Sequence, residues 1–196
     1  MKKKVCLLFL LVSGLLLTGC IPDQAEPEDY FPAEKGNHWE YEGTGNEYAS
    51  FKSEVLYTEN DHRIQIQEIN PATSVAAVYT ITDKAVTRVY FTGEKYDQEN
   101  LLQKADNDQT IILQTPLRKG TKWTTKKGQR EIQSVSETVE TPAGTFKNCL
   151  KIVIKEAGST SYEYYCNNVG LVKREFKTPD MQVSSILKNY QVEEDD

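Results

Sequence analysis

The chain alternates hydrophobic and polar residues over many short runs, and this pattern predicts β-strands along most of its length. In the run HRIQIQEI, Ile64 and Ile66 share one face, as a strand with a period of two residues requires. Turn-forming residues separate such runs at roughly 8–12-residue spacing, which is typical of antiparallel sheets. The predicted strands are residues 39–41, 47–57, 63–67, 75–82, 85–92, 110–114, 122–125, 131–139, 146–155, 161–166, 171–176 and 185–192.

The predicted fold class is all-β and mainly antiparallel. We expect a curved sheet, half-barrel or sandwich of roughly ten strands with at most one short helix. The one helix candidate is residues 96–105, where Asp97 would cap the N-terminus and Leu101 and Leu102 would be buried.

The first twenty residues have the layout of a secretory signal. Three lysines precede an apolar run at residues 5–17, which is shorter than the ~20 residues that span a bilayer. Gly19 stands directly before Cys20, and this arrangement resembles the lipobox of bacterial lipoproteins. The resemblance implies cleavage between Gly19 and Cys20 and acylation of the cysteine. An ordinary secretory signal that contains a cysteine is the alternative.

We therefore expect the mature protein to be anchored through lipid on Cys20 to the extracytoplasmic face of the cell membrane. Each buried methylene contributes about 0.8 kcal/mol, so two or three acyl chains hold a domain stably. Residues 20–29 are acidic and contain two prolines, which predicts a flexible tether. The expected organisation is a signal peptide at 1–19, a tether at 20–29, one β domain at 30–192 and an acidic tail at 193–196.

The charge balance argues against one class of partner. The chain has 23 Lys and Arg against 29 Asp and Glu, and loss of the three lysines of the signal leaves 20 against 29, about −9 in formal charge. Nucleic acids attract basic surfaces, so we expect no nucleic-acid partner.

Two cysteines, Cys149 and Cys166, remain in the mature domain, in a compartment where disulfides persist. They flank a predicted hairpin around Ala157 and Gly158. A two-residue loop would place Cys149 directly opposite Cys166, within reach of a disulfide. A three-residue loop would make them diagonal neighbours and leave a cleaner apolar face. Reduced, half-buried cysteines are a further alternative.

The motif P-x-x-K-G-x-x-W occurs twice, 84 residues apart. Proline fixes φ and glycine permits a left-handed backbone, so each copy predicts a turn that leads into a strand begun by a buried tryptophan. Two copies indicate either two related halves of one sheet or a chance recurrence of a common turn. The predicted turn and anchor residues here and later in the chain are Pro32, Gly36, Trp39, Pro116, Gly120, Trp123, Gly144, Phe146 and Gly170.

Several of these segments together resemble a family of bacterial cell-surface lipoproteins, mainly of Gram-positive type. The matching segments are YFPAEKGNHWEYE, TPLRKGTKW, TPAGTFKNCLKI and YYCNNVGLVKREF, which follow the family pattern PxxxGxxW, PAGTFxNCLK and VGLVK. The chain departs from the pattern before Val169, where a small residue, Pro and Gly are usual. The resemblance implies an antiparallel β domain outside the membrane, and it implies no catalytic residue.

Candidate chemistry is sparse. His38 and His62 fall in predicted turns, and no H-x-H, H-E-x-x-H or C-x-x-C spacing accompanies them. The segment 106–108 has two aspartates but lacks the glycine and distal glutamate of a calcium loop, so a polar turn is favoured. We therefore expect no metal, no cofactor and no catalytic residue. The strand tyrosines would either line a concave binding face or pack across strands, and packing is favoured: Tyr57, Tyr79, Tyr90, Tyr162, Tyr164, Tyr165 and Tyr190.

Two functions remain open from the sequence. The favoured one is a non-enzymatic, membrane-anchored module for binding, assembly or sensing, with an envelope protein, peptide, glycan or lipid as its ligand. The alternative is a tethered cell-envelope hydrolase whose site is assembled only in three dimensions.

Overall fold

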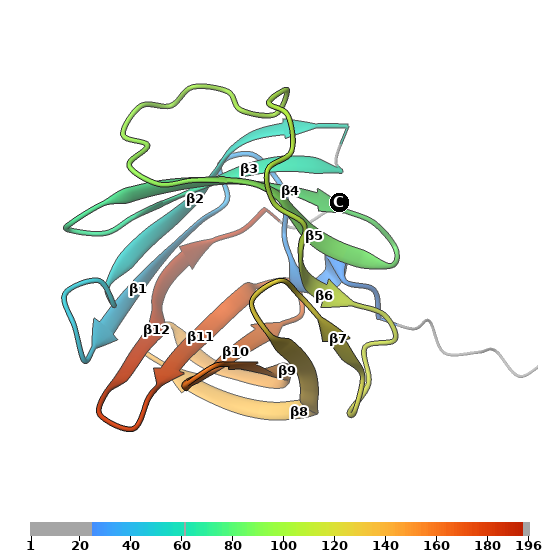
Figure 1. Ribbon diagram of the computed structural model, residues 1–196, viewed down its shortest axis with the longest axis vertical. Coiled ribbons are helices and arrows are strands. Elements are labelled where there is room, and N and C mark those ends of the chain that lie inside the picture. The colour runs from blue at the N-terminus through green and yellow to red at the C-terminus, as the bar shows by residue number, and fades with distance from the viewer. Residues whose placement is uncertain (1–24, 61, 194–196) are drawn as a thin grey trace, which may run out of the picture.

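Strands form at every position where the sequence predicts one. The structure is a computed structural model that describes residues 25–60 and 62–193 (Figure 1). Its elements are the 3-10 helix η1 (Glu28–Tyr30) and the strands β1 (His38–Thr44), β2 (Phe51–Glu59), β3 (Arg63–Ile69), β4 (Ser74–Ile81), β5 (Ala85–Thr92), β6 (Thr110–Gln114), β7 (Lys122–Thr124), β8 (Gln129–Thr141), β9 (Gly144–Glu156), β10 (Ser159–Cys166), β11 (Gly170–Lys177) and β12 (Gln182–Gln191).

All twelve strands belong to one antiparallel sheet that curves into a nearly closed barrel (Figure 1). The strand order is β6-β5-β4-β3-β2-β1-β12-β11-β10-β9-β8-β7, so each half of the chain contributes a six-stranded meander. The halves join through the β1–β12 ladder. The all-β prediction is confirmed, and of the three predicted forms the nearly closed barrel is closest to the half-barrel.

The two edge strands, β6 and β7, meet at a seam. No backbone ladder joins them within the described residues. Instead, the indole Nε1–H of Trp123 on β7 donates to the carbonyl oxygen of Ile111 on β6 at 3.0 Å. A side chain therefore makes a bond across the seam where the ladder is missing.

The repeated motif marks the same position in both halves. The N–H of Gly36 donates to Val55, whose N–H donates to Asn37. The second copy repeats this exchange between Gly120, Ile132 and Thr121. Trp39 then pairs with Ser53, two residues before Val55, just as Trp123 pairs with Arg130, two residues before Ile132. Of the two interpretations, structural repetition is confirmed.

The predicted helix at residues 96–105 is wrong. The segment between β5 and β6 is an irregular loop that crosses the outer face of the sheet (Figure 1). Leu101 and Leu102 are buried as expected, but they pack against Ala76, Val78 and Val89 on that outer face. Strand side chains, the loop's own side chains and nearby backbone carbonyls all bond to the loop backbone, so it does not need a helix to satisfy these groups.

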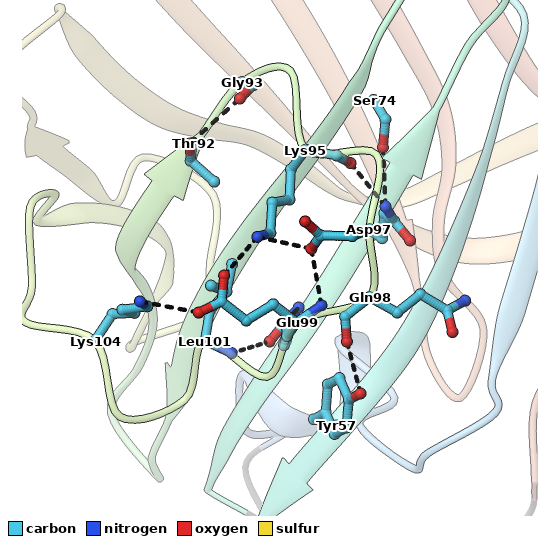
Figure 2. Close-up of polar contacts among 12 residues, drawn as sticks. Tyr57, Ser74, Thr92, Gly93, Lys95, Asp97, Gln98, Glu99, Leu101 and Lys104 are labelled. Atoms are coloured by element: carbon cyan, nitrogen blue, oxygen red, sulfur yellow. Dashed lines mark hydrogen bonds and ion pairs between the residues drawn. The ribbon is translucent and has the colours of Figure 1, made fainter.

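Buried glutamines of β3 hold this loop in place. Gln65 donates from Nε2 to the carbonyl of Glu99 at 2.9 Å and accepts from the N–H of Leu101 at 2.7 Å. Figure 2 shows the loop itself, in which the ammonium of Lys95 lies between Asp97 and Glu99. The loop thus covers the outer face of the sheet over β3, β4 and β5.

Several boundaries differ from the prediction, and three of them change the description of the fold. The segment 47–50 is a turn, so β2 begins at Phe51. The helix η1 begins inside the segment expected to be a tether, and Asn168 donates its N–H to the carbonyl of Asp29 at 2.7 Å. The folded part therefore begins before Tyr30. At the other end, the N–H of Glu193 donates to Asn37, and residues 194–196 of the expected tail lie outside the described residues.

Candidate functional site

A layer of charged side chains lies inside the barrel, at strand positions that the alternation assigns to the apolar face. Glu68 has the same parity as Ile64 and Ile66 on β3, and all three line the interior with strand neighbours on β2 and β4. Charged residues occupy the equivalent inward position on other strands. The layer comprises Glu68, Arg88, Arg130, Glu163 and Arg174.

Arg130 and Glu163 form the most buried ion pair of this layer. Their side chains are 6% and 16% exposed, and the guanidinium of Arg130 donates to Oε2 of Glu163. The hydroxyl of Tyr165 donates to the same oxygen at 3.0 Å. Burial and the nearby carboxylate of Glu163 raise the pKa of Tyr165, so its hydroxyl stays a donor. The charge of Glu163 is therefore already compensated by protein groups.

Arg88 is held by Asp108, which lies in the loop before β6. The Nε of Arg88 lies 2.6 Å from Oδ2 of Asp108, and Thr110 donates to Oδ1 at 2.8 Å. Partial burial alone would raise the pKa of Asp108, but the hydrogen bonds from Arg88 and Thr110 outweigh it and lower that pKa. The carboxylate stays ionised and fixes the direction of the Arg88 side chain.

Within the part of the chain that the structure describes, the side chain of Arg174 on β11 is held without a hydrogen bond. Its guanidinium lies 3.8 Å from Glu68, beyond hydrogen-bond length, and 4.5 Å from the ring centroid of Phe51. Its side chain is 37% exposed although it lies inside the barrel, because it borders open space there. Burial would lower the pKa of Arg174, but Glu68 and Glu163 raise it overall, so the side chain stays charged.

The open space consists of two cavities that meet at this layer. The first, which we call the aromatic cavity, has a volume of about 360 Å³ and includes Phe31, Trp39, Tyr41, Tyr79, Phe91 and Tyr165 in its lining. The second, the polar cavity, has about 380 Å³. Four residues line both cavities: Arg88, Ile112, Glu163 and Arg174. Each volume lies within the range of small-molecule sites, about 300–1,000 Å³.

Three of the predicted turn and anchor residues line the aromatic cavity. Trp39 lines the aromatic cavity and donates from Nε1 to the carbonyl of Val169 at 2.7 Å, while Pro32 and Gly170 line the same cavity. Gly36 and Gly120 have φ of 94° and 90°, the left-handed backbone expected of the two turns. The remaining predicted turn residues lie away from both cavities: Pro116 after a cis peptide bond, Gly144 at the start of β9 and Phe146 edge-on to Tyr190 at 6.0 Å.

The two domain cysteines form a disulfide across the β9–β10 hairpin. Ser159 pairs with Glu156, so the loop has two residues, and Cys149 and Cys166 lie opposite each other with their Cα atoms 4.3 Å apart. The register with a three-residue loop is wrong. The disulfide is buried in the main core and belongs to the scaffold rather than to the cavity lining.

The other candidate groups stay apart from the interior. His38 and His62 are exposed, and neither belongs to the lining of either cavity. Asp106 pairs with Arg63 at 2.9 Å, and Asp108 pairs with Arg88, so the segment 106–108 forms ion pairs with the barrel. Within the described residues, no group of three or more His, Cys, Asp and Glu side chains converges as a metal site would require. Gly19 and Cys20 lie outside the described residues.

The tyrosines divide between the two interpretations. Tyr79 and Tyr165 line the aromatic cavity, as the concave-face interpretation expects. Tyr162 and Tyr164 lie beside Lys151, at 5.1 and 5.5 Å from the ring centroids, and the remaining three pack against loops or strands: Tyr57, Tyr90 and Tyr190.

Sequence reasoning missed the charged layer, although a signal for it exists. In several strands one charged residue stands where the alternation places apolar neighbours. Arg88 follows Val86 by two residues, Arg130 precedes Ile132, and Arg174 lies between Val172 and Phe176. A buried charge is rare unless it is paired, so such a position on an otherwise apolar face indicates a site or a structural ion pair.

Comparison with known proteins gives the chain a fold but no activity. A family model described as DUF3108-like matches residues 93–186, just under half of the chain, and this stretch includes the second tryptophan motif and the PAGTF and VGLVK segments. No curated protein matches the sequence. Within the described residues, no helix has the length and apolar character needed to cross a membrane.

Two solved structures are similar over 83% of this chain and 98% of their own chains. One is a protein from Bacteroides fragilis described as exported and as having a YmcC-like fold, with 16% sequence identity and a TM-score of 0.52. The other is a protein from Parabacteroides distasonis described as a lipoprotein, with 17% identity and a TM-score of 0.47. At such low identity the first likeness supports the barrel fold over nearly the whole of that protein.

Proposed function

We propose that this protein is a lipid-anchored binding module on the extracytoplasmic face of the cell membrane, and that it holds a small ligand inside its barrel without catalysing a reaction. The observation that carries the proposal is the pair of cavities that meet at the charged layer. An interior that served only stability would be filled by side chains, as protein cores are. This interior is open on both sides of Arg88 and Arg174.

The lining is that of a binding site. Aromatic side chains form much of one wall, and a few polar groups converge where the cavities meet. Small-molecule sites combine such an apolar lining with a small number of placed polar groups that orient the ligand. The charged groups also have structural partners: Glu163 holds Arg130, and Asp108 holds Arg88. A binding role is supported by this arrangement more than a hydrolytic one, because both histidines lie outside the cavities.

The location is supported by the N-terminal sequence and by one comparison. The segment before Cys20 has the positive region, apolar run and small residues of a lipoprotein signal. The similar Bacteroides fragilis protein is described as exported. Lipid on Cys20, followed by a few residues of chain before η1, would hold the barrel close to the membrane surface.

The binding proposal is tested by asking whether the full-length protein retains a molecule. The protein is isolated from its own membranes in a mild nonionic detergent and examined by native mass spectrometry, with a denatured aliquot as the control. We expect a discrete added mass in the native sample that is lost on denaturation. A protein that carries no added mass after gentle isolation would contradict the proposal.

The anchor is tested separately. Globomycin blocks the peptidase that cleaves lipoprotein signals, so treated cells fed labelled palmitate should accumulate the precursor form. Cys20→Ser should remove the label. An unlabelled protein that is processed normally under globomycin would show that the lipid anchor is wrong.

A further inference from the structure

The guanidinium of Arg174 has hydrogen-bonding capacity that the protein does not use. A guanidinium presents five N–H donors. Among the described residues the side chain of Arg174 makes no hydrogen bond, and its ion-pair partner Glu68 lies 3.8 Å away. The carboxylate of Glu163, the cross-strand neighbour of Arg174, accepts hydrogen bonds from Arg130 and Tyr165 instead. The N–H donors of Arg174 are therefore available to a ligand that enters the cavities.

Arg88 adds a second set of donors at the same place. Its Nε is occupied by Asp108, but no described residue accepts a hydrogen bond from its two terminal nitrogens. Arg88 and Arg174 line both cavities, so the two side chains border the same space. Two guanidinium groups at one site suit an acceptor with several oxygens, because each can bind carboxylate or phosphate oxygens in a bidentate manner.

The polar cavity does not share the net negative charge of the chain. Its lining has four cationic side chains, Arg88, Lys127, Arg130 and Arg174, against the two carboxylates Glu156 and Glu163. Asp108, which pairs with Arg88, and Glu68, which lies 3.8 Å from Arg174, bring the carboxylates to four, so the charges balance. The whole chain has a formal charge of −6. The interior therefore lacks the net negative charge of the chain, and its guanidinium donors can receive an anion there.

The aromatic cavity provides the complementary half of the site. It contains two arginines and two glutamates, so its charges balance, and its remaining wall is mainly aromatic and aliphatic. Phe31 packs against Tyr79 with their ring centroids 5.1 Å apart, which gives part of this wall a defined shape. A ligand that occupied both cavities would place an apolar body here and its charged end at the layer.

We propose that the barrel binds an amphipathic anion, a molecule with a carboxylate or phosphate head and an apolar body, with the head held by Arg174 and Arg88. This inference rests on the proposed binding function and names the ligand class for it. Arg174 is the group that recognises the charge. The ion pairs of Arg130 and Asp108 serve to keep Glu163 and Arg88 in position.

The test uses three probes with the same eight-carbon chain and different heads: octanoate, octyl phosphate and the uncharged octanamide. Each is titrated by calorimetry into the full-length protein in phosphatidylcholine nanodiscs, with empty nanodiscs as the blank. We expect at least one of the two anions to bind at least tenfold more tightly than octanamide. The comparison of octanoate with octyl phosphate shows which head the site prefers.

Variants of Arg174 assign the effect to this residue. Arg174→Gln should bring the affinity for the anion down to that for octanamide, and Arg174→Lys, which keeps the charge, should retain a preference for the anion. Arg118→Gln, the same change at an exposed position, should have no effect. Circular dichroism and thermal unfolding verify that each variant is folded.

The outcomes separate this inference from the proposed function. Equal affinity of all three probes, or unchanged anion binding by Arg174→Gln, would overturn the anion specificity while leaving a binding barrel. A neutral molecule retained by the protein from its own membranes would do the same. If no probe binds and no molecule is retained, both the inference and the proposed function are wrong.

Discussion

Trp123 and Ile111 are joined by a hydrogen bond from indole nitrogen to backbone carbonyl at 3.0 Å, and this bond connects the first strand of the second half to the last strand of the first half. The equivalent residue of the first half, Trp39 on β1, makes a comparable bond to the carbonyl of Val169. Its strand β1, however, is already joined by backbone ladders to both of its neighbours, β2 and β12. The same motif thus anchors a strand in one half and bridges the seam in the other.

We predict that Trp123→Phe opens the seam. The substitution keeps most of the ring but leaves the carbonyl of Ile111 without its partner, which costs about 1–3 kcal/mol of the free energy of unfolding. Hydrogen exchange should rise at β6 and β7 together. Trp39→Phe is the matched control, and it should lower stability without a rise in exchange at the seam. Equal exchange at β6 and β7 in wild type and Trp123→Phe would show that the indole does not hold the seam.

The two turns before these tryptophans should respond alike to alanine. Gly36 and Gly120 have positive φ, and a Cβ at either position would meet open space, so only the backbone conformation is penalised. Gly36→Ala and Gly120→Ala should each lower the free energy of unfolding in urea by about 1–2 kcal/mol. Gly93→Ala, also in open space but without positive φ, should cost little. A large difference between the first two variants would contradict the equivalence of the motifs.

Gln65 should control the loop between β5 and β6. The side chain of Gln65 is fully buried and bonds the backbone at Glu99 and Leu101, so Gln65→Leu leaves two backbone groups unpaired at a cost of about 1–3 kcal/mol each. We expect faster proteolysis after Lys95 and Lys104. Gln109→Leu, an exposed change in the same loop, serves as control. Unchanged cleavage in Gln65→Leu would show that the loop is held by its leucines alone.

The disulfide should stabilise the second half. It closes a loop with a sequence separation of 17, for which the chain-entropy relation gives about 3 kcal/mol. The double variant Cys149→Ala, Cys166→Ala should therefore unfold at lower urea concentration, and a reducing agent should shift wild type but not the variant. If reduction leaves the wild-type midpoint unchanged, the bond contributes nothing to stability.

The Arg88–Asp108 pair predicts a dependence of stability on acid pH. The folded-state pKa of Asp108 lies below its ordinary value of 3.8, so ionisation of this carboxyl stabilises the fold above that pH. Asp108→Asn should destabilise the protein at neutral pH. The difference in the free energy of unfolding between this variant and wild type should shrink as the pH falls below 3.8 and Asp108 of the folded wild type becomes protonated. Asp83→Asn, at an exposed position, should show neither effect. A difference between wild type and Asp108→Asn that stays constant down to pH 2 would contradict the shift.

The sequence predicted the sheet well because strand alternation is a local signal. The strand predicted at residues 110–114 has its observed bounds, and the two-residue loop at Ala157 and Gly158, one of the two registers that the sequence allows, is the one observed. The helix at 96–105 failed because Leu101 and Leu102 found an apolar surface on the outer face of distant strands, where Gln65 supplied hydrogen bonds. Such tertiary partners cannot be read from the local pattern.

The candidate site was harder to predict because its members come from five strands. Glu68 and Arg174 belong to different halves of the chain and meet only when the barrel curves. Each alone looks like an ordinary surface charge in a strand with solvent on one side. The available signal is that each charged residue stands two positions from an apolar residue of the same strand face. Which face of a strand becomes the interior, however, depends on the bulges in the ladders, such as the one between Val78 and Tyr79.

The central claim, that the barrel interior holds the ligand, is tested most directly by closing the aromatic cavity. Ala77 lines this cavity, so the ring of Ala77→Phe would occupy it, while Ala72→Phe places the same ring on the surface. Native mass spectrometry of proteins isolated from their own membranes should find the added mass on wild type and Ala72→Phe but not on Ala77→Phe. The same added mass on a folded Ala77→Phe protein would show that the ligand binds elsewhere.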